Sequence, residues 1–96
     1  MEINNNFEKV LFSAATANGD SEIVPSGVYL YKSWQSSGTF VATVTIYGSL
    51  DGATWKSLGT ISTSGQILND NNLYAYTKAT ISSYTSGSVT VRLLSA

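Results

Sequence analysis

Apolar side chains alternate with polar or small ones along several short stretches of the chain. The clearest stretch is 40–61, which reads FVATVTIYGSLDGATWKSLGTI. On one face of its first half lie Phe40, Ala42, Val44 and Ile46. Side chains two positions apart in a strand point to the same face, so this period predicts a half-buried strand. The β-branched and aromatic residues of the stretch also fit a pleated, packed surface.

The second half of this stretch predicts the partner strand of a β-hairpin. Gly48 interrupts the alternation, which indicates a bulge or a close backbone approach. Asp51-Gly52 supplies the positive φ angles of a tight primed turn, and 54–61 then returns with Trp55 near its start. Asp51 is therefore interpreted as a turn residue rather than a ligand or an acid.

Other stretches carry the same strand signals and are separated by turn residues. They are 7–14, 21–24, 28–35, 66–68, 73–82 and 88–94. Within 28–35, Val28, Leu30 and Trp34 share the inward face, with Lys32 between them. The corresponding faces of the last two stretches carry Leu73, Ala75, Thr77, Ala79 and Ile81, and Val89, Val91 and Leu93. Strands of this length and spacing predict an all-β protein, an antiparallel β-sandwich or jelly roll of about seven to eight short strands. We expect one domain, 1–96, with 1–6 as an N-terminal arm.

Size and charge narrow the classes of function. A chain of 96 residues buries a thin core, and without cysteine no disulfide adds to it. Oligomerisation is a common remedy for so small a domain. Five basic and six acidic residues provide no basic field for nucleic acid. No basic amphipathic helix or long apolar run indicates a membrane, and the N-terminus lacks the features of a secretory signal.

Catalytic and metal chemistry find little support in the residue types. The chain has no histidine and no cysteine, which excludes Ser-His-Asp and Cys-His arrangements and zinc sites built on His and Cys. No spacing selects a carboxylate pair from Glu2, Glu8, Asp20, Glu22, Asp51 and Asp70. The run 69–72, NDNN, brings one carboxylate where calcium usually takes several. We therefore expect no enzyme, no metal and no cofactor, with 69–72 as a solvated loop.

The tyrosines form the candidate binding set. Each lies opposite the aliphatic stripe of its predicted strand; they are Tyr29, Tyr31, Tyr47, Tyr74 and Tyr76. Such residues can cover a sheet singly with their hydroxyls in water, form a protein interface, or stack on sugar rings. All three readings stay open. Trp34 and Trp55 are predicted to lie in the core.

Two segments resemble a group of small β-sandwich proteins of tailed-phage virions. Gly48, Ser49, Leu50, Asp51, Gly52 and Trp55 match their Gly-Ser-Leu-Asp-Gly turn before a Trp strand. Residues 84–91, YTSGSVTV, match their C-terminal ending, and weaker similarity covers 28–44. The motifs mark turns and strands and bring no active site. Lys32 departs from the pattern, because an apolar residue is expected there.

The resemblance implies a virion structural protein, and within that class a head decoration or cement protein. Such a protein binds the major capsid protein at the capsid surface as an oligomer, commonly a trimer. The arm that would clamp the capsid comprises Ile3, Asn4, Asn5, Asn6 and Phe7. The alternatives are a carbohydrate-binding module of a tail or baseplate, in which Tyr29, Tyr31, Tyr74 and Tyr76 form an exposed ladder, and a tail or neck adaptor.

Overall fold

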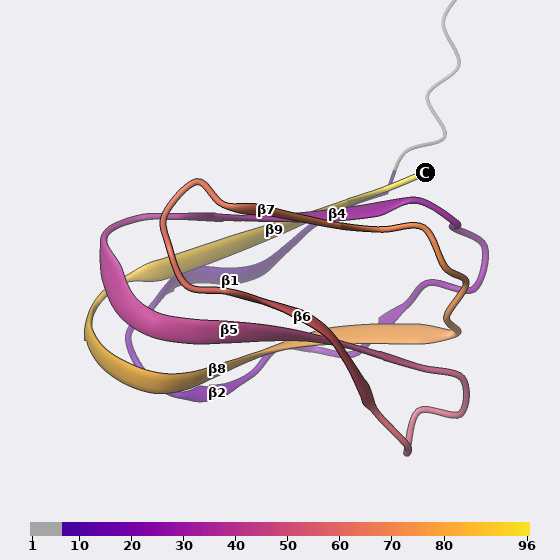
Figure 1. Cartoon of the computed structure of the whole chain (residues 1–96), viewed down its shortest axis with the longest axis horizontal. Helices are drawn as coiled ribbons and strands as arrows, with labels where there is room; N and C mark the ends of the chain where they lie inside the picture. The colour runs from indigo at the N-terminus through magenta and orange to yellow at the C-terminus, as the bar shows by residue number, and fades with distance from the viewer. Residues whose placement is uncertain (1–6) are drawn as a thin grey trace, which may run out of the picture.

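The protein is a sandwich of two antiparallel β-sheets, seen as two layers in Figure 1. The computed structural model describes residues 7–96. The upper sheet has the order β1-β9-β4-β7; the lower sheet has the order β2-β8-β5-β6, and β3 also pairs with β8. The strands are β1 (Phe7–Ala15), β2 (Gly19–Asp20), β3 (Val24–Pro25), β4 (Lys32–Ser37), β5 (Phe40–Ser49), β6 (Lys56–Ile61), β7 (Ile67–Asp70), β8 (Tyr76–Gly87) and β9 (Val89–Ser95). The predicted all-β sandwich is confirmed.

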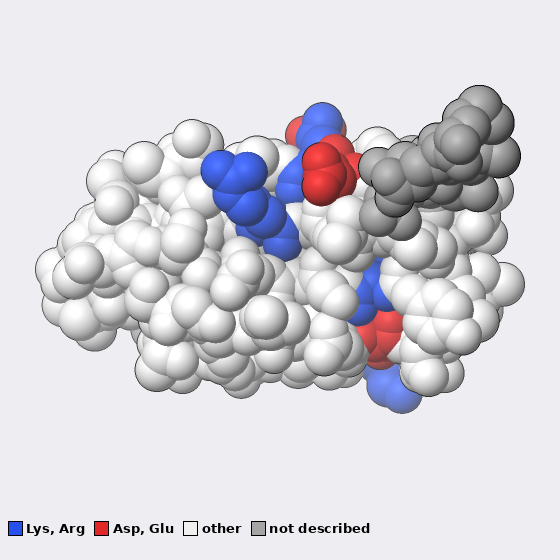
Figure 2. Space-filling model, turned by 90° about the horizontal axis from the view of Figure 1, so that it is seen from above, with Lys and Arg blue, Asp and Glu red and all other residues white. Residues whose placement is uncertain are grey.

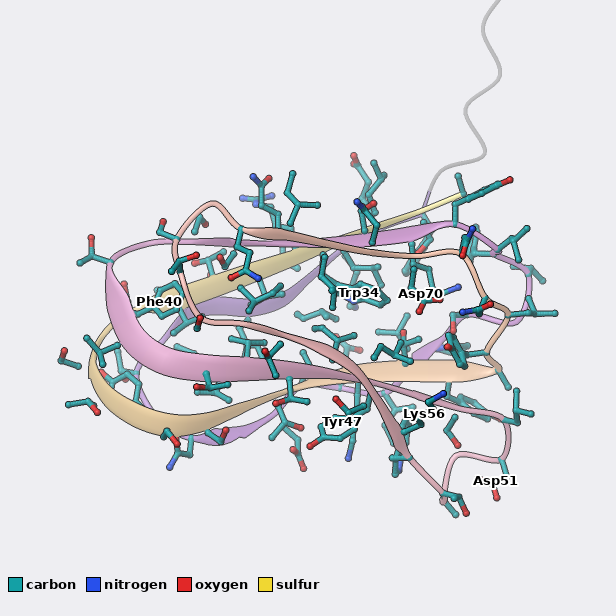
Figure 3. The ribbon with its side chains drawn as sticks, in the orientation of Figure 1. Trp34, Phe40, Tyr47, Asp51, Lys56 and Asp70 are labelled. Atoms are coloured by element: carbon teal, nitrogen blue, oxygen red, sulfur yellow. The ribbon has the colours of Figure 1, made fainter. Side chains whose placement is uncertain are left out.

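The core lies between the sheets and is formed by the apolar side chains that alternate with polar ones in the sequence. Trp34 is fully buried at its centre, as predicted, and Figure 3 places it between the two layers. Around it pack aliphatic side chains from both sheets: Val44, Ile46, Ile61, Ala79, Ile81, Val89, Val91 and Leu93. Burying each large side chain contributes about 1.5–3 kcal/mol relative to leaving it exposed. The inward faces predicted for β5, β8 and β9 are therefore the ones that form the core.

The predicted hairpin exists as β5 and β6, with a different connection. The loop runs over 50–55, and Asp51 does not have the positive φ angle that a primed turn needs. The predicted two-residue turn is therefore wrong. Of the two options for Gly48, close approach is the correct one, since a Cβ there would lie 2.8 Å from the Tyr74 ring. The bulge falls on β6 at Leu58, between the pairs Ile46–Gly59 and Tyr47–Ser57.

Several predicted strand bounds are also corrected. Residues 28–31 form a loop, and β4 begins only at Lys32. Val28 and Leu30, predicted to face inward, are therefore exposed. The predicted strand 21–24 is replaced by two separate two-residue strands, β2 and β3. The strand predicted over 73–82 begins at Tyr76 and continues to Gly87, because its second half pairs with the start of β5.

The chain passes from one sheet to the other between β4 and β5 and again between β8 and β9. Both connections lie at one end of the sandwich, on the left in Figure 1. The chain changes sheet through Gly38 (φ +96°) and Gly87 (φ +88°), angles that L-residues rarely adopt. The two corners touch, because the Ser88 N–H donates to the Thr39 carbonyl at 2.9 Å. A Cβ on Gly87 would overlap the Thr39 backbone. The contact between these corners fixes the two sheets relative to each other at this end.

The exposed edges of the sheets are short or irregular. β1, at the edge of the upper sheet, carries two register shifts, and Ala14 within it has a positive φ of 50°. β2 and β3 contain two residues each, and Pro25 cannot donate to a ladder. Bulges, prolines and short strands protect edges against pairing with other chains. Sheet faces and loops are therefore better candidates for binding than the edges on this side.

Replacing Gly87 with alanine tests the packed corner. We expect Gly87→Ala to lower the free energy of unfolding by roughly 2 kcal/mol or more, since both the backbone angle and the Thr39 backbone oppose a Cβ. Gly65→Ala is the matched control, with φ +79° and open space around the added Cβ, and should cost about 1 kcal/mol. Urea unfolding followed by tryptophan fluorescence measures both. Equal losses in the two variants would contradict the corner's role.

Candidate binding surface

Three loops meet at the end of the sandwich opposite the corners, on the right in Figure 1. We call this surface the tip and define it as residues 26–31, 50–55 and 71–75. Ser26 ties the first loop to the third: its N–H donates to the Ala75 carbonyl at 2.9 Å, and its hydroxyl donates to the Tyr74 carbonyl at 3.0 Å. The first and third loops of the tip are thus tied together.

Lys32 lies buried behind the tip and joins two of its loops. Its Nζ donates to the carbonyls of Tyr29 (3.3 Å), Leu30 (3.0 Å) and Asn72 (2.5 Å). The Tyr74 ring centroid lies 5.3 Å from the same nitrogen. Burial lowers the pKa of Lys32 below its usual range, and the negative charge of Asp70 partly offsets this. The buried amine thus finds three carbonyl acceptors, which offset the cost of removing it from water.

These contacts explain why position 32 carries a lysine, where the sequence pattern led us to expect an apolar residue. The alternation places Lys32 on the same face as Trp34, and both side chains are indeed buried. Lys32 is the first residue of β4, however, so its amine meets the carbonyls of the loops before the strand rather than aliphatic side chains. An amine with three donors suits such a site better than the apolar residue that was expected there.

Asp51 stabilises the second loop of the tip. Its Oδ1 accepts the N–H groups of Thr54 at 2.8 Å and Ala53 at 2.9 Å, and the Ser49 hydroxyl at 3.0 Å. These donors, with Thr54 first, lower the pKa of Asp51 to about 2. The interpretation of Asp51 as a turn residue is confirmed, although the turn is of another type. Its carboxylate holds the loop through Oδ1.

The tyrosine set is spread over separate environments. Tyr29 stacks on Phe7 with centroids 5.7 Å apart, and Tyr31 is 61% exposed and pairs through its backbone with Ala96. Tyr74 lies against Gly48, and Tyr76 lies against Gly52. Because 28–31 is a loop, the alternation that set these rings on one face does not apply there. Of Tyr29, Tyr31, Tyr74 and Tyr76, only Tyr31 is exposed, so the exposed ladder is not formed.

Tyr47 lies apart from the other four, on the outer face of the lower sheet. Lys78 is its partner in β8, with Nζ 5.7 Å from the Tyr47 ring and 4.6 Å from the Trp55 ring. Trp55, predicted to lie in the core, is instead half-buried beneath this lysine. The strand was predicted to begin at residue 54, whereas β6 begins two residues later, at Lys56, so Trp55 lies outside it. Cation–π contacts of this kind contribute about 0.5–1 kcal/mol at exposed sites.

The asparagine-rich run 69–72 uses its oxygen atoms within the fold. Asn69 and Asp70 belong to β7, where the Ser33 hydroxyl donates to Asn69 Oδ1 at 2.6 Å. Asp70 Oδ1 accepts the Asn72 N–H at 2.8 Å. Within residues 7–96, no group of three or more Asp, Glu, His or Cys side chains gathers to hold a metal ion. The oxygen atoms of this run therefore organise the backbone next to Lys32.

The predicted arm falls mostly outside the described residues. Ile3, Asn4, Asn5 and Asn6 lie there, and Phe7 is the first residue of β1. Phe7 is half-buried against Tyr29 and packs on the core. Phe7 thus has a structural role next to the tip.

The outer face of the upper sheet carries few charges. Figure 2 views it from above: most of the surface is uncharged, and the blue and red atoms lie in small mixed groups. One such pair joins Lys9 to Glu22 at 2.9 Å across the side of the sandwich. In the described part of the chain, no helix is long and apolar enough to cross a membrane. This face thus offers polar and apolar contacts and has no extended patch of positive or negative charge among the described residues.

Comparison with known proteins supports the fold. The SPBc2 prophage-derived protein YomS matches with a TM-score of 0.80 and 16% identity, over 99% of this chain and 96% of YomS. The PBSX exported protein XepA matches with a TM-score of 0.84 and 12% identity, over 99% of this chain. This chain spans only 39% of XepA. No family model and no curated protein matches the sequence.

A more distant likeness comes from Bacillus endospore appendages, described as a family of disulfide-linked pili. The TM-score is 0.53 with 14% identity, over 94% of this chain and 84% of the other. The present chain has no cysteine, so the linkage named for those pili has no counterpart here. At these levels of identity the comparisons establish a shared β-sandwich fold.

Removing the amine of Lys32 tests its role behind the tip. We expect Lys32→Met to lower the free energy of unfolding by roughly 2–4 kcal/mol, because three carbonyls of two loops lose their shared donor while the aliphatic stem is kept. Lys78→Met, which removes an amine from the outer face, should cost less than about 1 kcal/mol. Chemical denaturation of both variants measures the difference. A Lys32→Met protein as stable as the wild type would show that these carbonyls do not depend on the amine.

The Asp51 carboxylate predicts an acid dependence of stability. Its pKa is about 2 in the folded protein and about 4 in an unfolded chain, so its stabilising effect is present above pH 4 and lost as the pH falls toward 2. The stability difference between wild type and Asp51→Asn should therefore shrink over this interval in thermal unfolding. Glu8→Gln, at an exposed acid, is the control. A difference that is constant with pH would refute the assignment.

Proposed function

We propose that this chain is a structural protein of a phage particle and works by binding, without chemistry of its own. The observation that carries the proposal is the likeness to YomS, a prophage-derived protein, over almost the whole length of both chains. XepA, named for the PBSX element, contains the same sandwich. The resemblance of segments 47–58 and 81–91 to virion sandwiches supports the same class independently of the fold.

Within this class we propose decoration of the capsid. The chain would bind the major capsid protein at the particle surface as an oligomer, with a trimer favoured. A small domain makes limited contacts, but several subunits bound at once raise the total strength through multivalency. The predicted arm, residues 3–7, and the tyrosine-bearing surfaces would supply contacts to the capsid and to sister subunits.

A tail or baseplate adaptor is the second candidate. XepA favours it, because there the same sandwich is one part of a longer chain, as expected of a module that joins other parts. The carbohydrate-binding alternative is weaker, since three of the four rings of the expected sugar platform, Tyr29, Tyr74 and Tyr76, are half-buried.

Particles produced with and without the gene for this chain test the proposal. For a decoration protein, quantitative mass spectrometry of purified particles should find copies comparable to the major capsid protein. Particles lacking the chain should then release DNA at a lower temperature, as followed by a dye that binds free DNA. A few copies per particle would favour the adaptor, and absence from purified particles would overturn a virion role.

A further inference from the structure

Exposed apolar side chains gather at the tip. Ten large hydrophobic side chains are exposed within residues 7–96, and five of them belong to the tip loops. These are Val28 (85% exposed), Leu30, Tyr31, Leu50 (75%) and Leu73 (57%). The opposite end, with its glycine corners, has no such group among the described residues. An uneven distribution of this kind marks an interaction surface.

A groove of about 520 Å³ lies between the second and third tip loops. Leu50 and Leu73 stand on its two sides, and Gly48 and Tyr74 also line it. This volume falls in the range of clefts that hold a small ligand or a partner's side chain. Figure 3 shows Asp51 on the loop that forms one wall and Lys56 where β6 begins beside it.

The walls of the groove are held in place by the contacts described above. Tyr74 packs directly on Gly48, where a Cβ would not fit, and Asp51 fixes the loop that carries Leu50. Lys32 fixes the chain on the other side through the Asn72 carbonyl, next to Leu73. A surface ordered before binding loses little conformational freedom on association, so its apolar contacts contribute more fully to affinity.

One positive charge borders this apolar groove. Lys56 lines it and is exposed, and among the described residues it forms no ion pair. The Asp51 carboxylate also lines the groove, and its Oδ1 accepts two backbone N–H groups and a hydroxyl. The groove therefore complements an apolar side chain that has a carboxylate beside it.

We propose that the tip is the surface by which this domain attaches to a protein of the particle. The groove between Leu50 and Leu73 receives an aliphatic or aromatic side chain of that protein, and Lys56 pairs with an adjacent carboxylate. This inference rests on the proposed virion role and adds which surface docks and what chemistry it recognises. A single exposed lysine beside an acid is too little for an anionic lipid surface, which attracts clusters of basic residues.

Binding to purified particles made without the chain tests the inference. The double variant Leu50→Asp, Leu73→Asp places charges on both sides of the groove and should bind at least about tenfold more weakly than the wild type. Val41→Asp is the matched control, because Val41 is 57% exposed, like Leu73, and pairs with Ser86 beside the Gly87 corner at the opposite end, and should bind like the wild type. Lys56→Glu should weaken binding through repulsion of the partner's carboxylate. Co-sedimentation at increasing protein concentration measures all four proteins, and circular dichroism verifies folding.

The outcomes separate the two proposals. Wild-type protein that fails to bind particles overturns both the virion role and the docking surface. Wild-type binding that the double variant retains overturns the tip alone and leaves the virion role standing. If the double variant does not fold, a photoreactive benzoylphenylalanine at position 73, compared with one at position 41, gives a second measurement. Cross-links to a particle protein from position 73 alone support the inference.

Two further results would replace the proposed partner. Cross-links from position 73 to a second copy of this chain would make the tip a self-association surface. Binding of the wild type, but not the double variant, to vesicles of phosphatidylcholine and phosphatidylglycerol would make it a lipid-binding surface. Either result overturns a particle protein as the occupant of the groove.

Discussion

Burial of the apolar faces of two sheets around Trp34 is the interaction on which the rest of this structure depends. The indole is fully buried, and the aliphatic side chains of β5, β8 and β9 close around it. No disulfide or metal site built on His and Cys can support so small a core, because the chain has neither residue. Its packing must therefore be protected at both open ends of the sandwich, where water could otherwise enter.

The two ends solve this problem with different chemistry. At one end, Gly38 and Gly87 let the chain cross between sheets in corners so tight that a side chain on either would meet the neighbouring backbone. At the other end the loops are longer, and their carbonyls turn inward toward Lys32. A buried amine there costs desolvation, which its three acceptors and the nearby Asp70 charge offset. The glycine end consists of tight corners, whereas the lysine end carries exposed loops on a fixed frame.

This division fits a protein that acts by binding. Association is favoured when the binding surface is already ordered, and the tip loops are ordered by hydrogen bonds that involve Lys32, Asp51 and Ser26. None of these three residues needs to touch a partner to matter for binding. The exposed side chains of the tip include four aliphatic ones and Tyr31, and such residues support protein interfaces more than chemistry. The prophage-derived proteins with the same fold show that the sandwich occurs both nearly alone and within a longer chain.

The sequence by itself determined the fold class and the core faces, because a period of two is a local property of each strand. It identified the hairpin of β5 and β6, the inward faces of β5, β8 and β9, and Trp34 as a core residue. It could not determine where strands end. The loop 28–31, the bulge at Leu58 and the half-buried Trp55 all depend on contacts between segments distant in the sequence. The same holds for the tyrosines and for Lys32, whose acceptors lie up to 40 residues away. Only the tertiary structure, which gathers three loops at one end, decided where the exposed apolar residues meet.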